Sequence, residues 1–405
     1  MAEPIVLAFS GGLDTSFCVP WLKETYGSDV ITVIVDTGGL DDAERSRLAA
    51  KSQQLGAVGH HCIDARDDFF AETLRWLLAG NVLRGAMYPL CVGAERSLQA
   101  RVVAEQARKL GAKAIAHGCT AAGNDQVRFE VALRTLAPEL QVIAPVRDHG
   151  FSREHEASYL RERGIAVSAE RAAYSVNRGL WGVTIGGKET TDTVESIPES
   201  GWVLTRGAFD ASRAPQSLTI AFEQGVPVAL DGKRLAPVAL IETLDRVAAP
   251  FGIGRGIHLG DTILGMKGRV AFEAPAATLL IAAHRELEKL VLTQRQLRLK
   301  ETVASLYGDW IHEGQWVEPA CRDAEALLAH AQEHVTGEVR MQLRTGHAFV
   351  SGVSSPFSLK AASKAVYGEA AGEWSAADAA GFSRILGLPA QLAARARARA
   401  RGAGR

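Results

Sequence analysis

The sequence predicts an α/β fold, a doubly wound parallel sheet followed by an α+β domain and a helical C-terminal tail. Apolar, β-branched runs alternate with amphipathic stretches over residues 1–165, which is typical of parallel strands separated by helices. After Arg171 the pattern changes to Gly-rich turns and alternating strands. The last residues, 392–405, are rich in alanine and arginine, which favours a helix.

Five runs in the first part are predicted strands, and they lie at 5–9, 30–35, 58–63, 112–116 and 141–143. Helices are expected between them, most clearly over residues 93–110. There Leu98, Val102 and Ala107 fall on one face, and Gly111 supplies a left-handed stop. A doubly wound sheet follows from this order.

The second part should contain strands at 218–222 and 226–230, with Asp231-Gly232 as a hairpin turn. A helix is expected over 237–249, beginning at a first-turn proline. One long helix is expected over 275–308, followed by strands within 335–353. In the tail, arginines at every second position spread charge around a helix, so a solvated or subunit-contacting role is favoured over nucleic-acid binding.

Composition narrows the function classes. A chain of 405 residues with 47% hydrophobic and 22% charged residues has the balance of a folded protein of more than one domain. Its net charge of -1 provides no global attraction to nucleic acid or membranes. The start of the chain and the lack of an 18-residue apolar run favour a cytoplasmic protein that neither crosses nor binds a membrane.

The five cysteines form no C-x-x-C pair, which fits free thiols in a reducing compartment. His60-His61-Cys62 resembles a metal-ligand cluster, but adjacent residues of a strand point to opposite faces. A zinc site is therefore not expected there.

A Gly-rich loop, residues 10–16, follows the first strand and leads into helical sequence. Its glycines allow a tight turn, and the helix N-terminus adds a positive end, so phosphate is the expected ligand. The loop lacks the lysine of G-x-x-x-x-G-K-[ST], which disfavours ordinary γ-phosphate transfer. It matches S-G-G-x-D-[ST], typical of enzymes that attack the α-phosphate of ATP, although a plain turn is the alternative. Pro20 inside the following helix should kink it.

A second polar loop, within residues 117–130, follows the strand at 112–116 at the edge where ligands gather in such sheets. Hydroxyl, amide, carboxylate and guanidinium groups lie close together there, which suits an amino-acid zwitterion. Asp125 could meet an ammonium group, and Arg128 could meet a carboxylate in bidentate fashion.

Taken together, these motifs resemble the argininosuccinate synthase family of the PP-loop ATP pyrophosphatase superfamily. Residues 8–16 resemble its ATP loop, and 118–130 its G-x-T-x-x-G-N-D-Q-V-R-F-E segment. Residues 174–184 resemble its Y-S-x-[DN] segment, and 252–255 and 265–267 its G-[VI]-G-R and G-[IM]-K segments. The resemblance implies an ATP-binding domain at 1–168, a synthetase domain at 169–360 and an oligomerisation tail at 361–405, in a homotetramer.

The resemblance also implies site residues. ATP would be bound by Ala8, Phe9, Ser10, Gly11, Gly12, Leu13, Asp14, Thr15, Ser16, Val35 and Gly118, with Asp14 helping to hold Mg2+. Aspartate would be bound by Thr120, Asn124 and Asp125, and citrulline by Tyr88, Asn124, Arg128, Ser175 and Thr184. The groups expected to orient the reacting molecules are Asp14, Asn124 and Arg128.

At three positions the sequence departs from the family. The pocket serine becomes Gly93, the pocket glutamate becomes Gly260, and a second pocket tyrosine becomes Phe272. The citrulline end therefore looks rebuilt. The candidates to compensate are Asp261, Glu95 and Glu189, with Asp261 first because it follows Gly260 in an expected Gly-flanked turn.

The reaction implied joins aspartate to citrulline, converts ATP to AMP and pyrophosphate, and serves arginine biosynthesis. An alternative is a PP-loop enzyme that adenylates another carbonyl, such as a tRNA base. A second alternative is a nucleotide-binding regulator without chemistry. The first should show a basic face or catalytic cysteines, and the sequence has neither apart from its Arg-rich end.

Overall fold

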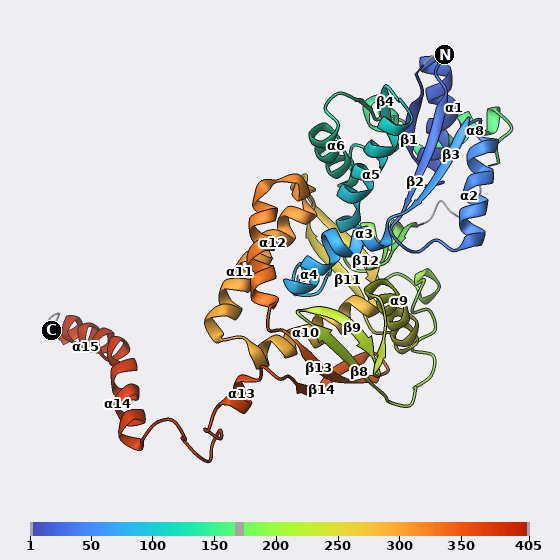
Figure 1. Ribbon diagram of the computed structural model, residues 1–405. Helices are drawn as coiled ribbons and strands as arrows, with labels where there is room; N and C mark the ends of the chain where they lie inside the picture. Colours follow the sequence, from blue (N-terminus) through green and yellow to red (C-terminus); the bar gives the residue numbers. More distant parts are fainter. Residues whose placement is uncertain (1–2, 167–173, 403–405) are drawn as a thin grey trace. The chain divides into compact units, whose positions relative to one another are not determined.

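Five parallel strands form the first sheet, in the order β3-β2-β1-β4-β5 (Figure 1). The computed structural model describes residues 3–166 and 174–402. The strands are β1 (Ile5–Ala8), β2 (Val30–Asp36), β3 (Gly59–Asp64), β4 (Ala114–His117) and β5 (Gln141–Ile143). All five predicted strands are therefore present, with small shifts at their ends.

Helices cover both faces of this sheet. Along β1, Ile5 and Leu7 face one apolar core together with residues of α1 (Leu13–Tyr26), α2 (Asp42–Gln54) and α8 (Arg153–Glu162). Val6 faces the other core with residues of α5 (Arg96–Lys109) and α6 (Asp125–Leu136). Because alternate residues of each strand are buried on opposite faces, the strands read as continuous apolar runs. The predicted doubly wound sheet is confirmed.

Two antiparallel sheets follow, in the orders β10-β9-β8-β13-β14 and β11-β12-β7-β6. The strands of the first are β8 (Gln216–Glu223), β9 (Val226–Leu230), β10 (Lys233–Arg234), β13 (Gly337–Arg344) and β14 (His347–Ser354). Those of the second are β6 (Ser175–Gly179), β7 (Gly182–Gly186), β11 (Arg255–Asp261) and β12 (Lys267–Glu273). At the predicted hairpin, Asp231 and Gly232 both have positive φ, at 49° and 78°.

Other helices complete the unit Met1–Pro356. They are α3 (Arg66–Phe69), α4 (Arg75–Ala79), α7 (Pro145–His149), α9 (Pro237–Ala248) and α12 (Pro319–Gln332). Short turns of other helix types lie at Phe70–Leu74, Gly93–Glu95, Lys188–Thr191, Glu199–Gly201, Ala249–Phe251 and Gln315–Val317. The predicted helix over 93–110 therefore begins with a 3-10 turn, and α1 continues through Pro20 as one element.

The single long helix predicted over 275–308 is wrong, because the chain forms two helices, α10 (Pro275–Val291) and α11 (Gln294–His312). Leu292 is extended, with ψ 144°, and Thr293 caps the second helix. The Thr293 hydroxyl accepts a hydrogen bond from the Gln296 backbone N–H at 3.3 Å, and the Gln296 side chain accepts one from the Thr293 N–H at 2.9 Å. This reciprocal capping box starts a new helix at a point where the apolar periodicity continues without a break, so the periodicity alone predicts one helix.

The second unit, Phe357–Arg405, contains α13 (Leu359–Ala362), α14 (Ala376–Leu386) and α15 (Leu388–Gly402). Ser375 caps α14 by accepting a hydrogen bond from the Asp378 N–H. The predicted helical tail is therefore present. Phe382, Ile385 and Leu386 form an exposed apolar stripe on α14.

Among the described residues, no helix combines the length and apolar character that crossing a bilayer requires. All five cysteines lie in the described part of the chain and are free thiols.

Thr293→Ala should lower the free energy of unfolding by about 1 kcal/mol, because α11 loses the side chain that caps its N-terminus. Thr302→Ala in the middle of the same helix should change it by less than about 0.5 kcal/mol, since its hydroxyl only bonds back to Arg298. Urea unfolding followed by circular dichroism measures both variants. Equal losses would show that the cap contributes nothing.

Candidate active site

One cleft of about 2220 Å³ lies at the carboxyl ends of the parallel strands and extends to β6, β7, β11 and β12. Every residue that the sequence assigned to ATP, aspartate or citrulline lines this cleft. Gly93 and Gly260 line it too. Residues from segments far apart in sequence are therefore brought to one cavity.

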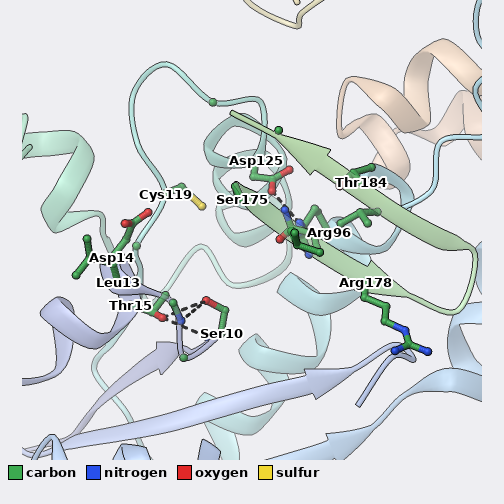
Figure 2. A pocket seen from close by; sticks show the side chains of 18 of the residues that line it. Ser10, Leu13, Asp14, Thr15, Arg96, Cys119, Asp125, Ser175, Arg178 and Thr184 are labelled. Carbon is green, nitrogen blue, oxygen red and sulfur yellow. Dashed lines mark hydrogen bonds and ion pairs between the residues drawn. The ribbon is translucent and has the colours of Figure 1, made fainter. Parts of the chain in front are cut away.

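The glycine-rich loop turns sharply before α1 (Figure 2). Gly11 has φ 70°, which glycine adopts without strain, and a Cβ there would lie 2.2 Å from Leu48 Cδ2, so any other residue would be strained and would force the loop or Leu48 to shift. The Ser10 and Thr15 hydroxyl oxygens lie 3.1 Å apart, and the Ser16 hydroxyl donates to the Gly12 carbonyl at 2.6 Å. No side chain among residues 3–166 and 174–402 caps α1, so its first N–H groups are available to an anion.

The loop after β4 packs directly against this helix start. A Cβ at Gly118 would lie 3.0 Å from Thr15 Cγ2 and 3.1 Å from the Asp14 carbonyl carbon. Glycine at 118 thus brings the second polar loop beside the first.

Asp125 lies between two guanidinium groups. Arg96 Nε donates to Asp125 Oδ2 at 2.9 Å, and Arg128 Nη1 donates to Oδ1 at 2.7 Å. Burial alone would raise the pKa of Asp125, but the two arginines outweigh it and lower the pKa to about 2. Asp125 and Arg128, which the sequence analysis expected to bind the charged groups of an amino acid, are therefore paired with each other.

Arg96 was missed at the sequence level. It also donates to Glu95 at 3.1 Å, Gln99 at 2.9 Å and Asn177 at 3.2 Å, which joins α5 to β6. Its position in the first turn of a helix could have indicated this role, because the helix dipole disfavours a cation there unless carboxylates lie near it.

Arg128 is buried and connects α6 to the end of α11. Its Nε donates to the His312 carbonyl at 2.8 Å. A Cβ at Gly93 would lie 3.2 Å from the guanidinium carbon of Arg128, so glycine at 93 leaves room for this side chain. The replacement of the family's serine by Gly93 therefore affects the space available to the Arg128 side chain.

Asn124 ties the second loop to the β11–β12 turn, because its Oδ1 accepts from the Ile263 N–H at 2.9 Å. Ser175 begins β6 and is exposed, and Thr184 lies in the middle of β7. Thr184 pairs with Phe272 across the sheet. Buried Tyr88 packs against Phe272 with ring centroids 5.2 Å apart.

Gly260 and Asp261 lie in strand β11, and the expectation of a turn there is wrong. The strand forms because residues 255–261 pair in register with 267–273. Adjacent strand residues point to opposite faces, so the Asp261 side chain does not replace one at 260. It is instead exposed and forms an ion pair with Lys267 at 2.5 Å.

The two other compensation candidates are also engaged. Glu95 is buried and accepts from the Thr37 hydroxyl at 2.6 Å as well as from Arg96. Burial raises the pKa of Glu95 to about 7 despite Arg96. Glu189 accepts a hydrogen bond from the Tyr174 hydroxyl.

Asp125→Asn should lower stability near neutral pH, because the arginines lose their shared charge. Since the folded pKa of Asp125, about 2, lies below its unfolded value of about 3.9, its contribution is present above pH 4 and is lost as pH falls towards 2. The difference in unfolding free energy between wild type and variant should therefore shrink over this range. Urea unfolding at pH 7, 4 and 3 measures it.

Asp42→Asn is the control, because that side chain is 97% exposed and its pair with Arg45 should contribute little. A constant difference for Asp125→Asn from pH 7 to 3 would contradict the shared ion pair.

Comparisons with known proteins agree with this geometry. The arginosuccinate synthase N-terminal HUP domain matches residues 4–166, and the arginosuccinate synthase C-terminal domain matches residues 174–393. The argininosuccinate synthase of Methanocaldococcus jannaschii is 39% identical over 392 residues, which cover 97% of this chain and 98% of the relative. That of Dehalococcoides mccartyi is 40% identical and covers 97% of both chains.

The argininosuccinate synthase of Xanthomonas campestris pv. campestris is 40% identical over 400 residues, which cover 96% of this chain and 98% of the relative. The two domain matches together cover most of the chain, and these relatives are similar over nearly their whole length. The chain belongs to the argininosuccinate synthase family of ATP-dependent ligases.

Proposed function

We propose that the chain joins L-aspartate to the ureido carbon of L-citrulline, with conversion of ATP to AMP and pyrophosphate and formation of argininosuccinate. The observation that carries this proposal is the shared cleft, in which the phosphate loop and the segment 120–128 face one cavity. Three reactants must meet in such a reaction, and a cleft of about 2220 Å³ is large enough for them.

The chemistry requires activation. Nitrogen lone pairs reduce the electrophilicity of a ureido carbon, so direct attack by an amine is slow. Attack of the ureido oxygen on the α-phosphate releases pyrophosphate and leaves an adenylated isourea. The aspartate amine then adds to the ureido carbon, and AMP leaves with the former ureido oxygen. No covalent intermediate with the protein is needed, so positioning supplies the rate enhancement.

The roles of individual residues follow the position of each group in the cleft. The ATP site would comprise Ala8, Phe9, Ser10, Gly11, Gly12, Leu13, Asp14, Thr15, Ser16, Val35 and Gly118. Aspartate would contact Thr120, Asn124 and Asp125, and citrulline would contact Tyr88, Asn124, Arg128, Ser175 and Thr184. We assign Asp14, Asn124 and Arg128 as orienting groups. To bind a substrate carboxylate, Arg128 would use donors beyond those engaged by Asp125 and His312.

Mg2+ fits beside Asp14. Glu156 on α8 lies close enough that burial and then the Asp14 charge raise the pKa of Glu156 to about 8. Its buried Oε2 has no hydrogen-bond partner within the described part of the chain. Mg2+ is commonly held by one or two carboxylates together with substrate phosphates, and it would neutralise charge on the leaving pyrophosphate. No group of three or more acidic, histidine or cysteine ligands exists among the described residues, so phosphates and water would complete the shell.

We further propose the domain division 1–168, 169–360 and 361–405, a cytoplasmic location and a homotetramer. The exposed apolar stripe Phe382, Ile385 and Leu386 on α14 supports a subunit-contacting tail, because such stripes are usually buried against a partner. Light scattering of the full chain tests the tetramer, and a single-subunit mass would contradict it.

AMP and pyrophosphate should form in equal amounts only when ATP, aspartate and a ureido acid such as citrulline are all present. Chromatography of the nucleotides and a coupled pyrophosphate assay measure this. Omission of aspartate or of citrulline should each stop AMP release at steady state. ADP and phosphate as the stoichiometric products would refute the proposed reaction.

Gly11→Ala should weaken ATP binding at least about tenfold, because the left-handed backbone is strained and the new methyl displaces the loop against Leu48. Gly27→Ala at the end of α1 is a matched control, since its φ is also left-handed at 60° but no described atom lies within 4 Å of an added Cβ. Both variants should lose about 1 kcal/mol of stability, and only the first should lose ATP affinity. Calorimetric titration with ATP measures the difference, and equal affinities would contradict the loop assignment.

A further inference from the structure

An imidazole lies buried in the cleft wall formed by β11. His258 is 8% exposed, and its ring stacks on Tyr88 with centroids 5.4 Å apart and an interplanar angle of 17°. Its Nε2 is buried and has no hydrogen-bond partner among the described residues. A buried polar atom without a partner is costly, so a ligand that satisfies this nitrogen would gain affinity.

His258 occupies the space beside Gly260. The two residues are two positions apart in one strand and share a face. A Cβ at Gly260 would lie only 2.5 Å from His258 Nε2. The imidazole therefore occupies the volume that a side chain at 260 would fill, where the family resemblance predicts a glutamate.

Three carboxylates that the structure describes near this wall are already paired with cationic side chains. Asp125 is held by two arginines, Asp261 is paired with Lys267, and Glu95 is paired with Arg96. Burial, followed by the charge of Arg84, lowers the pKa of His258, which favours the neutral imidazole. A neutral imidazole gives or takes a hydrogen bond but offers no negative charge to an ammonium group.

Resting on the proposed function, we propose that His258 binds the ureido acceptor through Nε2 and determines its specificity, so that the acceptor needs no charged α-ammonium group. The pocket then recognises ureido acids by their carboxylate and ureido ends. Citrulline and its analogue without the α-amino group, 5-ureidopentanoate, are equivalent acceptors for this chain.

The test uses the full-length protein with ATP, Mg2+ and aspartate, and scores AMP release with each acceptor. Wild type should use citrulline and 5-ureidopentanoate with kcat/KM values within about threefold. His258→Phe keeps the ring and its stacking but removes Nε2, and it should raise KM for both acceptors about tenfold. KM for ATP and for aspartate should stay within about twofold.

Two further variants separate recognition from packing. His258→Gln, which restores a hydrogen-bonding group, should recover part of the acceptor KM. His60→Phe is the matched control, because His60 Nε2 is also buried without a partner but lies on β3 outside the cleft lining. It should leave acceptor KM unchanged.

The double variant His258→Ala/Gly260→Glu should regain a preference for citrulline of about tenfold or more, because it removes the ring and adds a carboxylate. Gly260 has no positive φ, so its backbone accepts a side chain once the imidazole is gone.

A wild type that prefers citrulline more than tenfold, or a folded His258→Phe with unchanged acceptor KM, would overturn the assignment while the proposed function stands. If ATP binds but no ureido acid with aspartate gives AMP, the proposed function and this inference both fall. Thermal melting and circular dichroism confirm that each variant is folded.

Discussion

The walls of the cleft depend on one carboxylate, that of Asp125, which two guanidinium groups share. Arg96 also reaches Asn177 on β6, and Arg128 also reaches the His312 carbonyl at the end of α11. The shared ion pair thus ties the parallel sheet to the antiparallel sheet and to the helices behind it. Removal of the carboxylate would leave the two largely buried guanidinium groups without their shared counter-charge, which destabilises the folded state. We infer that these ion pairs of Asp125 with Arg96 and Arg128 hold the walls of the cleft in place before any substrate binds.

Close backbone approaches hold the remaining edges of the cleft. The Leu180 N–H donates to the Thr37 carbonyl at 2.9 Å, and a Cβ at Gly38 would lie 2.5 Å from the Leu180 nitrogen. Gly118 approaches the start of α1 in the same way. At such points a side chain cannot be accommodated by rotation, because the atoms in the way belong to the main chain. Glycine is therefore dictated by packing between segments as much as by turn geometry.

The sequence was sufficient for features encoded locally. The continuous apolar run around Val6 predicts a strand buried on both faces. The Gly-rich loop between β1 and α1 predicts the phosphate site. Neither prediction needs long-range information. The break at Thr293 was missed because a single capping box outweighs apolar periodicity that continues on both sides. Arg96 and His258 were missed because their partners, Asp125 and Tyr88, lie far away along the chain. Pairings of this kind follow only from the fold.

The group that replaces the side chain missing at Gly260 depends on the local fold. Reasoning along the sequence favoured the next residue, Asp261, which would be reasonable in a flexible turn. In strand β11, however, neighbours face opposite sides, and residues two positions apart share one. His258 meets that condition and lies 2.5 Å from the Cβ position of residue 260. The imidazole of His258 therefore fits the cleft wall in this position only because residue 260 is a glycine. A neutral imidazole in place of a carboxylate removes a negative charge from this wall. Without that charge, the cost of taking the substrate's α-ammonium group out of water is not offset, so the wall no longer favours an acceptor that carries one.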